Sequence, residues 1–178
     1  VWTRYHYATK QRLFGDLKME IIDNYLAPDL FKIVQETIML SQNTPWFLNT
    51  DVSGHGVEKH PYFTHLMHHD HRANSNHFDQ CIVPILFMFG ANALLRVKVN
   101  LYPRTETLYH YHDHYDYDFE HKAAILYLNT NNGYTIFEDG TKVESIENRL
   151  LKFDATKMHH STTCTDQQYR ANINFNYF

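Results

Sequence analysis

The sequence lacks the features that mark disulfide-bonded, cysteine-zinc and membrane-spanning proteins. Only two cysteines occur, Cys81 and Cys164, one in an apolar run and one in a Ser/Thr-rich segment. From these we expect neither a disulfide framework nor a cysteine-type zinc site. The longest apolar run, residues 81–90, contains Pro84 and has about half the length needed to cross a bilayer. No charged-then-apolar leader opens the chain, so we expect no membrane partner and a reducing, cytoplasmic location.

Clusters of basic residues are missing as well. The formal net charge is −4 and no Lys/Arg block occurs, whereas a protein that binds duplex nucleic acid needs concentrated positive charge. The expected partner is therefore a protein or small-molecule substrate, with single-stranded or modified bases left open. The sequence does not indicate an oligomeric state.

Internal repeats and low-complexity linkers are also absent. The length of 178 residues suits one domain with a real core and is short for two. Residues 1–18 look unlike the rest of the chain, and a strand-like pattern begins at Met19. We therefore predict a single domain over residues 19–178, preceded by a possible N-terminal extension over residues 1–18.

Histidine and aromatic residues are abundant instead, with 14 His, 13 Tyr and 12 Phe. Helical periodicity marks residues 28–40 and about 77–89, with a kink expected at Pro84. Residues 44–76 have little periodicity beyond a short strand at 62–67. From Leu94 onward, seven or so alternating segments are separated by turn signals. This order predicts a mostly β (α+β) fold, a β-sandwich or jelly roll with the N-terminal helices packed on one sheet.

Alternation also separates two faces on the first and the last of these predicted strands. In residues 170–177 the polar positions begin with Arg170 and continue through three asparagines, while the apolar positions fall between them. Residues 96–102 repeat the pattern, with Lys98 and Tyr102 on the polar face. The polar faces are either solvated or line a wet cavity while the apolar faces pack under the helices.

The run YHYHDHYDYD, residues 109–118, is the densest cluster of possible metal ligands. If it is a strand, His110, His112, His114 and Asp116 project to one side, and His114 and Asp116 can chelate one ion. An open-sided Fe(II) centre needs a third protein ligand from elsewhere. The pair His159 and His160 near the C-terminus can supply it.

These residues give the chain a resemblance to a known family. The motif His114-x-Asp116, the segment AILYLNTNNGYTIFEDGTKVESIENRLLKFD, His159 in HHSTTCTD and Arg170 in YRANINFNYF resemble the Fe(II)- and 2-oxoglutarate-dependent oxygenases. Within them the chain is most similar to the prolyl-4-hydroxylase-like group, especially small members of the type carried by marine phages. The resemblance spans roughly residues 19–178 and is dense after Leu94. One departure is the longer segment between Tyr102 and His114.

The resemblance implies a double-stranded β-helix of the cupin-like type. It implies that His114, Asp116 and His159 hold Fe(II) and form the catalytic centre, and that Arg170 and Tyr102 bind 2-oxoglutarate. The implied reaction uses O2, hydroxylates a C–H bond of an unidentified substrate and releases succinate and CO2. His159 is preferred over His160 because family members show His, one free residue, a small residue and then Thr-Thr.

Several alternatives remain open at this stage. The pair His68-x-Asp70 has the same spacing as His114-x-Asp116 but precedes the strand region. A cupin-type metalloenzyme without 2-oxoglutarate would use His112-x-His114, and a non-catalytic jelly-roll binding module would use no metal. Lys98 is a rival to Arg170 as the anchor of 2-oxoglutarate. Residues that either contact ligands or belong to the core are Trp46, Phe47, His110, His112, Tyr127, Asn129 and Thr162.

Overall fold

Two β-sheets face one another in the computed structural model, which describes residues 18–52 and 56–178. The predicted extension lies outside these ranges except for Lys18. The helices are α1 (Pro28–Met39), α2 (Phe78–Cys81) and α3 (Val83–Phe89). The strands are β1 (Glu20–Ile22), β2 (Phe47–Asp51), β3 (Val57–His69), β4 (Arg72–Ala73), β5 (Leu94–Pro103), β6 (Lys122–Tyr127), β7 (Tyr134–Phe137), β8 (Lys142–Glu144), β9 (Leu150–Asp154), β10 (His159–Ser161) and β11 (Tyr169–Tyr177).

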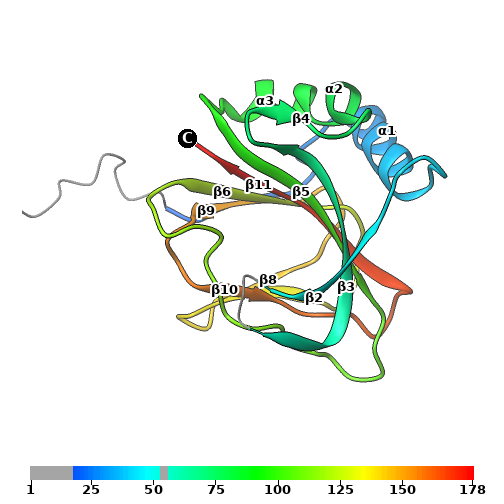
Figure 1. Ribbon diagram of the computed structural model, residues 1–178, viewed down its shortest axis with the longest axis vertical. Coiled ribbons are helices and arrows are strands. Elements are labelled where there is room, and N and C mark those ends of the chain that lie inside the picture. The colour runs from blue at the N-terminus through cyan, green and yellow to red at the C-terminus, as the bar shows by residue number, and fades with distance from the viewer. Residues whose placement is uncertain (1–17, 53–55) are drawn as a thin grey trace, which may run out of the picture.

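The large sheet is antiparallel and has the order β1-β9-β6-β11-β5-β3-β2, with β4 paired to β3. The small sheet has the order β10-β7-β8. All three helices cover one face of the large sheet, and the small sheet faces its other side (Figure 1). This architecture confirms the prediction of a mostly β fold with helices packed on one sheet.

The main core lies between the helices and the large sheet. Helix α1 begins at Pro28 in its first turn, where the missing amide is tolerated, and buries Phe31, Val34 and Ile38. The predicted second helix is interrupted at Ile82, so Pro84 falls in the first turn of α3. The apolar face of β11 completes the core with Ala171, Ile173, Phe175 and Tyr177.

The opposite face of the large sheet looks toward the small sheet. A second apolar cluster on β6, β7, β8 and β9 fills one part of the space between the sheets. A cluster of Val52, Tyr62, Tyr102 and Tyr111 fills another. The polar positions of β5 and β11 lie on this inner face, so they line the interior and are not a solvated surface.

Two expectations about local structure were wrong. Residues 44–76 are not mainly irregular, because they form β2 and the 13-residue strand β3. The run 109–118 is not a strand, since only His110 and His114 make isolated bridges, to Thr162 and His159. Strands β5 and β11 already have partners on both edges, so this segment cannot pair with either of them. It passes instead from the large sheet toward β10.

The described residues contain no helix that is long and apolar enough to span a membrane. Both cysteines are free and buried.

Candidate active site

A small polar cavity lies between the sheets, on the inner face of β5 and β11. Its volume is about 30 Å³, which is room for about two water molecules. A larger ligand therefore requires lining side chains to move. The lining includes the three predicted metal ligands and the predicted co-substrate contact Tyr102. Its members are Val52, Tyr62, Lys98, Asn100, Tyr102, Tyr111, His114, Asp116, Ile125, His159, Ser161, Asn172 and Asn174.

The rings of His114 and His159 lie side by side at this cavity, with centroids 4.9 Å apart. Antiparallel backbone hydrogen bonds between the two residues set this approach. Each Nδ1 lies 3.0 Å from the carbonyl oxygen two residues earlier, that of His112 for His114 and that of Lys157 for His159. A carbonyl can only accept, so each Nδ1 carries a proton, and Nε2 is the ring atom that can offer a lone pair to a metal. Metal-binding histidines are oriented by the same type of contact.

Burial favours the neutral form of His114. Burial, together with the neighbouring His159, lowers the pKa of the His114 imidazole to about 4. A metal ligand must be neutral imidazole, so His114 is in its ligating form across the physiological pH range.

The carboxylate of Asp116 is buried beside these rings, with 4% of its side chain exposed. Arg96 donates from Nη2 to Oδ1 at 2.6 Å. Asn176 and Asn174 donate to Oδ2 at 2.8 Å and 3.2 Å. Burial alone would raise the pKa of Asp116, but Arg96, followed by His159 and Lys98, holds it well below its usual range. Asp116 is therefore ionised.

The structure brings His114, Asp116 and His159 to one cavity without assembling a finished metal site. Across residues 18–52 and 56–178, no three His, Cys, Asp or Glu side chains form a group that could hold a metal ion as they stand. The Nε2 atoms of the two rings have no hydrogen-bond partner in the part of the chain that the structure describes, whereas the Asp116 carboxylate is bound to Arg96 and the asparagines. The donor set of two imidazoles and one carboxylate is nevertheless the set that suits an open-sided Fe(II) centre.

Arg170 does not line the cavity and lies behind Tyr102. Its side chain is fully buried, and its Cζ lies 5.3 Å from the centre of the Tyr102 ring. It donates to the hydroxyls of Ser145 at 2.6 Å and Thr135 at 3.1 Å. All its hydrogen-bond partners in the described part of the chain are neutral, so this buried charge has no acid to balance it. Such a charge is costly to bury, and an anionic ligand would offset the cost.

Close packing holds Arg170 in place. A Cβ added to Gly133 would lie 2.6 Å from Arg170 Cδ and 2.5 Å from the carbonyl oxygen of Thr163. Any other residue at position 133 would place its Cβ against the Arg170 side chain, so only glycine fits there.

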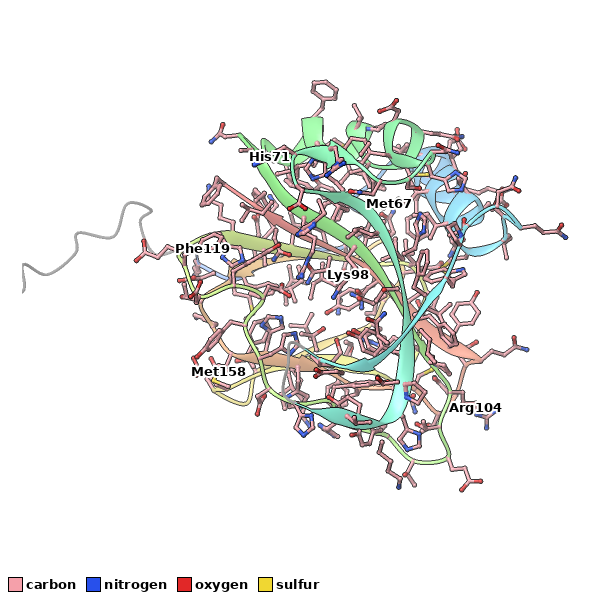
Figure 2. All side chains as sticks on the ribbon, viewed as in Figure 1. Met67, His71, Lys98, Arg104, Phe119 and Met158 are labelled. Atoms are coloured by element: carbon pink, nitrogen blue, oxygen red, sulfur yellow. The ribbon has the colours of Figure 1, made fainter. Side chains whose placement is uncertain are left out.

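Lys98 provides a second positive charge on the same inner face. Figure 2 shows it reaching from β5 into the space between the sheets, where it lines the cavity. Burial, with Arg96 nearby, lowers the pKa of Lys98 to about 8. No hydrogen bond or ion pair joins its ammonium group to another residue in the described ranges.

Several polar atoms around the cavity lack hydrogen-bond partners. Asn100 donates from Nδ2 to Asn172 Oδ1 at 3.1 Å. That leaves Asn100 Oδ1 and Asn172 Nδ2 without partners among the described residues, together with Asn174 Oδ1 and the Tyr111 hydroxyl. A buried unsatisfied polar group costs about 1–3 kcal/mol, so this lining suits water or a polar ligand rather than an apolar one.

Sequence reasoning missed Arg96, Asn176, His121 and Glu58. Alternation placed Arg96 and Asn176 on the polar faces, but not their contact with Asp116. His121 is oriented in the same way as His114 and His159, because its Nδ1 lies 2.8 Å from the carbonyl oxygen of Phe119. Its Nε2, however, already has a partner, Asn176 Nδ2 at 3.3 Å. The buried carboxylate of Glu58 on β3 ties down the histidine run, because it accepts from the Tyr109 hydroxyl and from the backbone and ring of His112.

His110, His112 and the C-terminal His160 turn away from the cavity. His160 Nδ1 lies 2.6 Å from Asp113 Oδ1, and its Nε2 lies 2.9 Å from His110 Nδ1. His159, not His160, therefore faces the cavity. His112 is exposed and bound to Glu58, so the cupin-type pair His112-x-His114 is not brought together at the cavity.

The remaining alternatives have structural contacts. His68 lies in β3 and stacks on Phe78, while Asp70 is exposed in the following turn. Tyr127 is buried and donates to the Thr135 hydroxyl. Among the other candidates, Thr162 is fully buried, Asn129 is bound to the backbone of β11, Trp46 packs on the main core and Phe47 is exposed.

The structure is similar to solved oxygenases. A prolyl-4-hydroxylase from Pseudomonas putida superposes with a TM-score of 0.60 and 16% identity, covering 89% of this chain and 91% of the other. A 2OG-Fe(II) oxygenase family oxidoreductase from Burkholderia pseudomallei gives a TM-score of 0.63 at 11% identity, covering 89% and 84%. A Trichoplax adhaerens prolyl hydroxylase, solved with a hypoxia inducible factor oxygen degradation domain peptide fragment, gives 0.62 at 17% identity, covering 89% and 83%.

No protein-family model matches the sequence, and no curated protein matches it. The structural similarity therefore establishes the fold. The chain has the prolyl-hydroxylase-like jelly-roll fold of the 2-oxoglutarate–Fe(II) oxygenases, which confirms the predicted double-stranded β-helix.

Proposed function

We propose that this chain is an Fe(II)- and 2-oxoglutarate-dependent oxygenase that hydroxylates a C–H bond of a protein or small-molecule substrate in the cytoplasm. The observation that supports this most strongly is the pairing of metal-type donors with uncompensated positive charge. Two imidazoles with free Nε2 atoms and one ionised carboxylate meet at a cavity. The fully buried Arg170 behind it has only neutral partners among the described residues.

In this proposal His114, Asp116 and His159 hold the metal. Bound Fe(II) would supply the activation of O2 and the oxidising chemistry, with succinate and CO2 as co-products. His112 O and Lys157 O fix the two imidazoles with Nε2 toward the cavity. Arg96, Asn174 and Asn176 keep Asp116 ionised and buried.

Arg170 is proposed to bind the distal carboxylate of 2-oxoglutarate, with Tyr102 beside it. A guanidinium offers a planar two-pronged contact to a carboxylate, whereas an ammonium is a point charge. Lys98 lies at the other end of the inner face, near His114 and Asp116, and adds to a positive potential that favours a dianion.

The test is the formation of succinate from 2-oxoglutarate with Fe(II) and oxygen. His114→Ala should lower turnover by more than about 100-fold, because it removes a direct metal ligand. Asp116→Asn should do the same, whereas Asp70→Asn, the acid of the His68-x-Asp70 pair in an exposed turn, should retain turnover. Unchanged turnover in His114→Ala refutes the assignment. A non-catalytic binding module would instead show no metal-dependent affinity for 2-oxoglutarate by calorimetry.

A further inference from the structure

Both oxygens of the Asp116 carboxylate already accept hydrogen bonds from the protein's own donors. Arg96 contacts one oxygen at 2.6 Å, and Asn176 and Asn174 contact the other at 2.8 Å and 3.2 Å. A hydrogen bond between ionised groups at this distance is of the strong kind. A divalent cation that binds Asp116 must therefore displace one of these contacts or share an oxygen with it.

The two histidines are prepared differently. Their Nε2 atoms have no hydrogen-bond partner in the described ranges, and their Nδ1 atoms are anchored. The two imidazoles are thus oriented toward the cavity, while the anionic ligand is paired with a cation.

We propose that Arg96 is an internal counter-cation that holds Asp116 in the metal-free protein and competes with the divalent cation for it. The inference rests on the proposed function, because it takes His114, Asp116 and His159 as the metal ligands. Arg96 also contacts the Tyr117 ring in the same conformation, with its Cζ 5.2 Å from the ring centre, within the range of a cation–π contact. This contact and the 18% exposure of the side chain would continue to stabilise the guanidinium if a metal took Asp116 from it.

A competing role and an orienting role predict changes in metal affinity of opposite sign. If Arg96 merely orients Asp116 for the metal, removing it should weaken metal binding by about 10–100-fold, as for other supporting residues. If Arg96 competes, removing it should strengthen metal binding by at least about fivefold, the lower end of typical coupling between two ligands. Lys98 adds repulsion in both cases and does not change the sign.

The experiment measures Mn(II) binding by calorimetry in the full chain. Arg96→Gln should bind Mn(II) at least about fivefold more tightly than the unmodified protein. Arg149→Gln is the matched control, because Arg149 also pairs with a carboxylate, Asp23, at 2.6 Å and lies away from the metal ligands in the fold. Its loss should leave Mn(II) affinity unchanged.

The outcomes separate this inference from the proposed function. Equal or weaker Mn(II) binding in Arg96→Gln overturns the competing role while the metal site stands. No Mn(II) binding in any form of the protein overturns both proposals.

A second measurement observes Arg96 in the unmodified protein. In nitrogen-15-labelled unmodified protein, the Arg96 Nη signal should be protected in the metal-free state because of its contact with Asp116, with Arg96→Lys used only for assignment. Saturating Zn(II), a diamagnetic probe, should shift the signal or abolish its protection. The inference is contradicted if Zn(II) perturbs the His114 and His159 signals but leaves the Arg96 signal unchanged.

Discussion

Single side chains on the inner face of β5 and β11 supply the positive charge of the candidate site. Arg170 and Lys98 both face the space between the sheets without an acid partner among the described residues. They differ in geometry, because Arg170 is fixed by three neutral acceptors and Lys98 has a flexible stem. The fixed guanidinium is the better anchor for a carboxylate, since less entropy is lost on binding.

Replacing these two cations should therefore weaken 2-oxoglutarate binding unequally. Arg170→Gln should lower the affinity by at least about 30-fold, because the loss of a buried charged contact costs about 2–5 kcal/mol. Lys98→Gln should lower it by less than about tenfold. Calorimetry with Mn(II)-loaded protein measures both, and a larger loss in Lys98→Gln would make Lys98 the anchor.

Buried histidines make the stability of the fold depend on pH. Burial lowers the pKa of four of them, His65, His68, His114 and His121. His65 is a clear case away from the site: Pro45 O accepts from Nδ1 at 2.8 Å, and Ser75 Oγ lies 2.7 Å from Nε2. Its neutral ring is satisfied, and protonation must occur in a buried position.

The free energy of unfolding should consequently fall with decreasing pH. The unfolded histidine has a pKa of about 6.5, and the folded pKa of His65 lies below that value. Below about 6.5 the unfolded chain thus binds more protons, and stability is lost as the pH drops toward the folded pKa. His65→Gln should make the pH dependence shallower in urea denaturation at pH 7.5 and 5.5, with His71→Asn in an exposed turn as the control. An unchanged slope in His65→Gln contradicts this account.

The sequence indicated part of the site at this scale. The i, i+2 spacing of His114 and Asp116, together with the family resemblance that singled out His159, led to residues that line one cavity. The contacts of Asp116 with Arg96 and Asn176 could not be predicted, because they depend on the path of an irregular segment. Alternation alone showed that both residues lie on the polar face.

Among the secondary-structure elements, strand β11 was the most predictable. Its alternation separates core residues from cavity residues, and both faces are buried. Strand β3 was predicted only over residues 62–67, because its apolar positions do not alternate regularly and Pro61 interrupts the pattern. The structure accommodates Pro61 where the register with β2 shifts. The histidine run alternates like a strand but lacks strand partners, which periodicity cannot reveal.

Helix α1 offers a matched pair of isoleucines to test its packing on the sheet. Ile38 is fully buried and Ile33 is 43% exposed. Ile38→Ala should lower the free energy of unfolding by about 2–5 kcal/mol, whereas Ile33→Ala should change it by less than about 1 kcal/mol. Urea denaturation at constant pH compares the two, and similar losses would mean that α1 does not pack as described.

For the whole molecule, the space between the two sheets is polar at one end and apolar at the other. The polar end contains buried groups that lack partners among the described residues. The overall jelly roll was predictable from the order of helices and strands together with the resemblance to known oxygenases. The small volume of the cavity was not, because it depends on how the side chains of Tyr62, Tyr102 and Tyr111 pack against one another.

Ligands that occupy this space should stabilise the entire fold. Mn(II) and 2-oxoglutarate at about 100 times their dissociation constants should each add about 2.7 kcal/mol, which corresponds to a rise in Tm of roughly 5–10 °C for each ligand in a domain of this size. Calorimetric unfolding measures the shift, and a chelator should reverse the part due to the metal. His114→Ala should remove the metal-dependent shift, and a full shift in that variant would place the metal elsewhere.

Strand β11 also limits how the chain can change by insertion and deletion. Because successive residues alternate between the helix-side core and the cavity, adding or removing one residue within 169–177 would turn Arg170 and the asparagines toward the helices and the apolar side chains toward the ligand. Folding and binding would be lost in the same step, with no viable intermediate length.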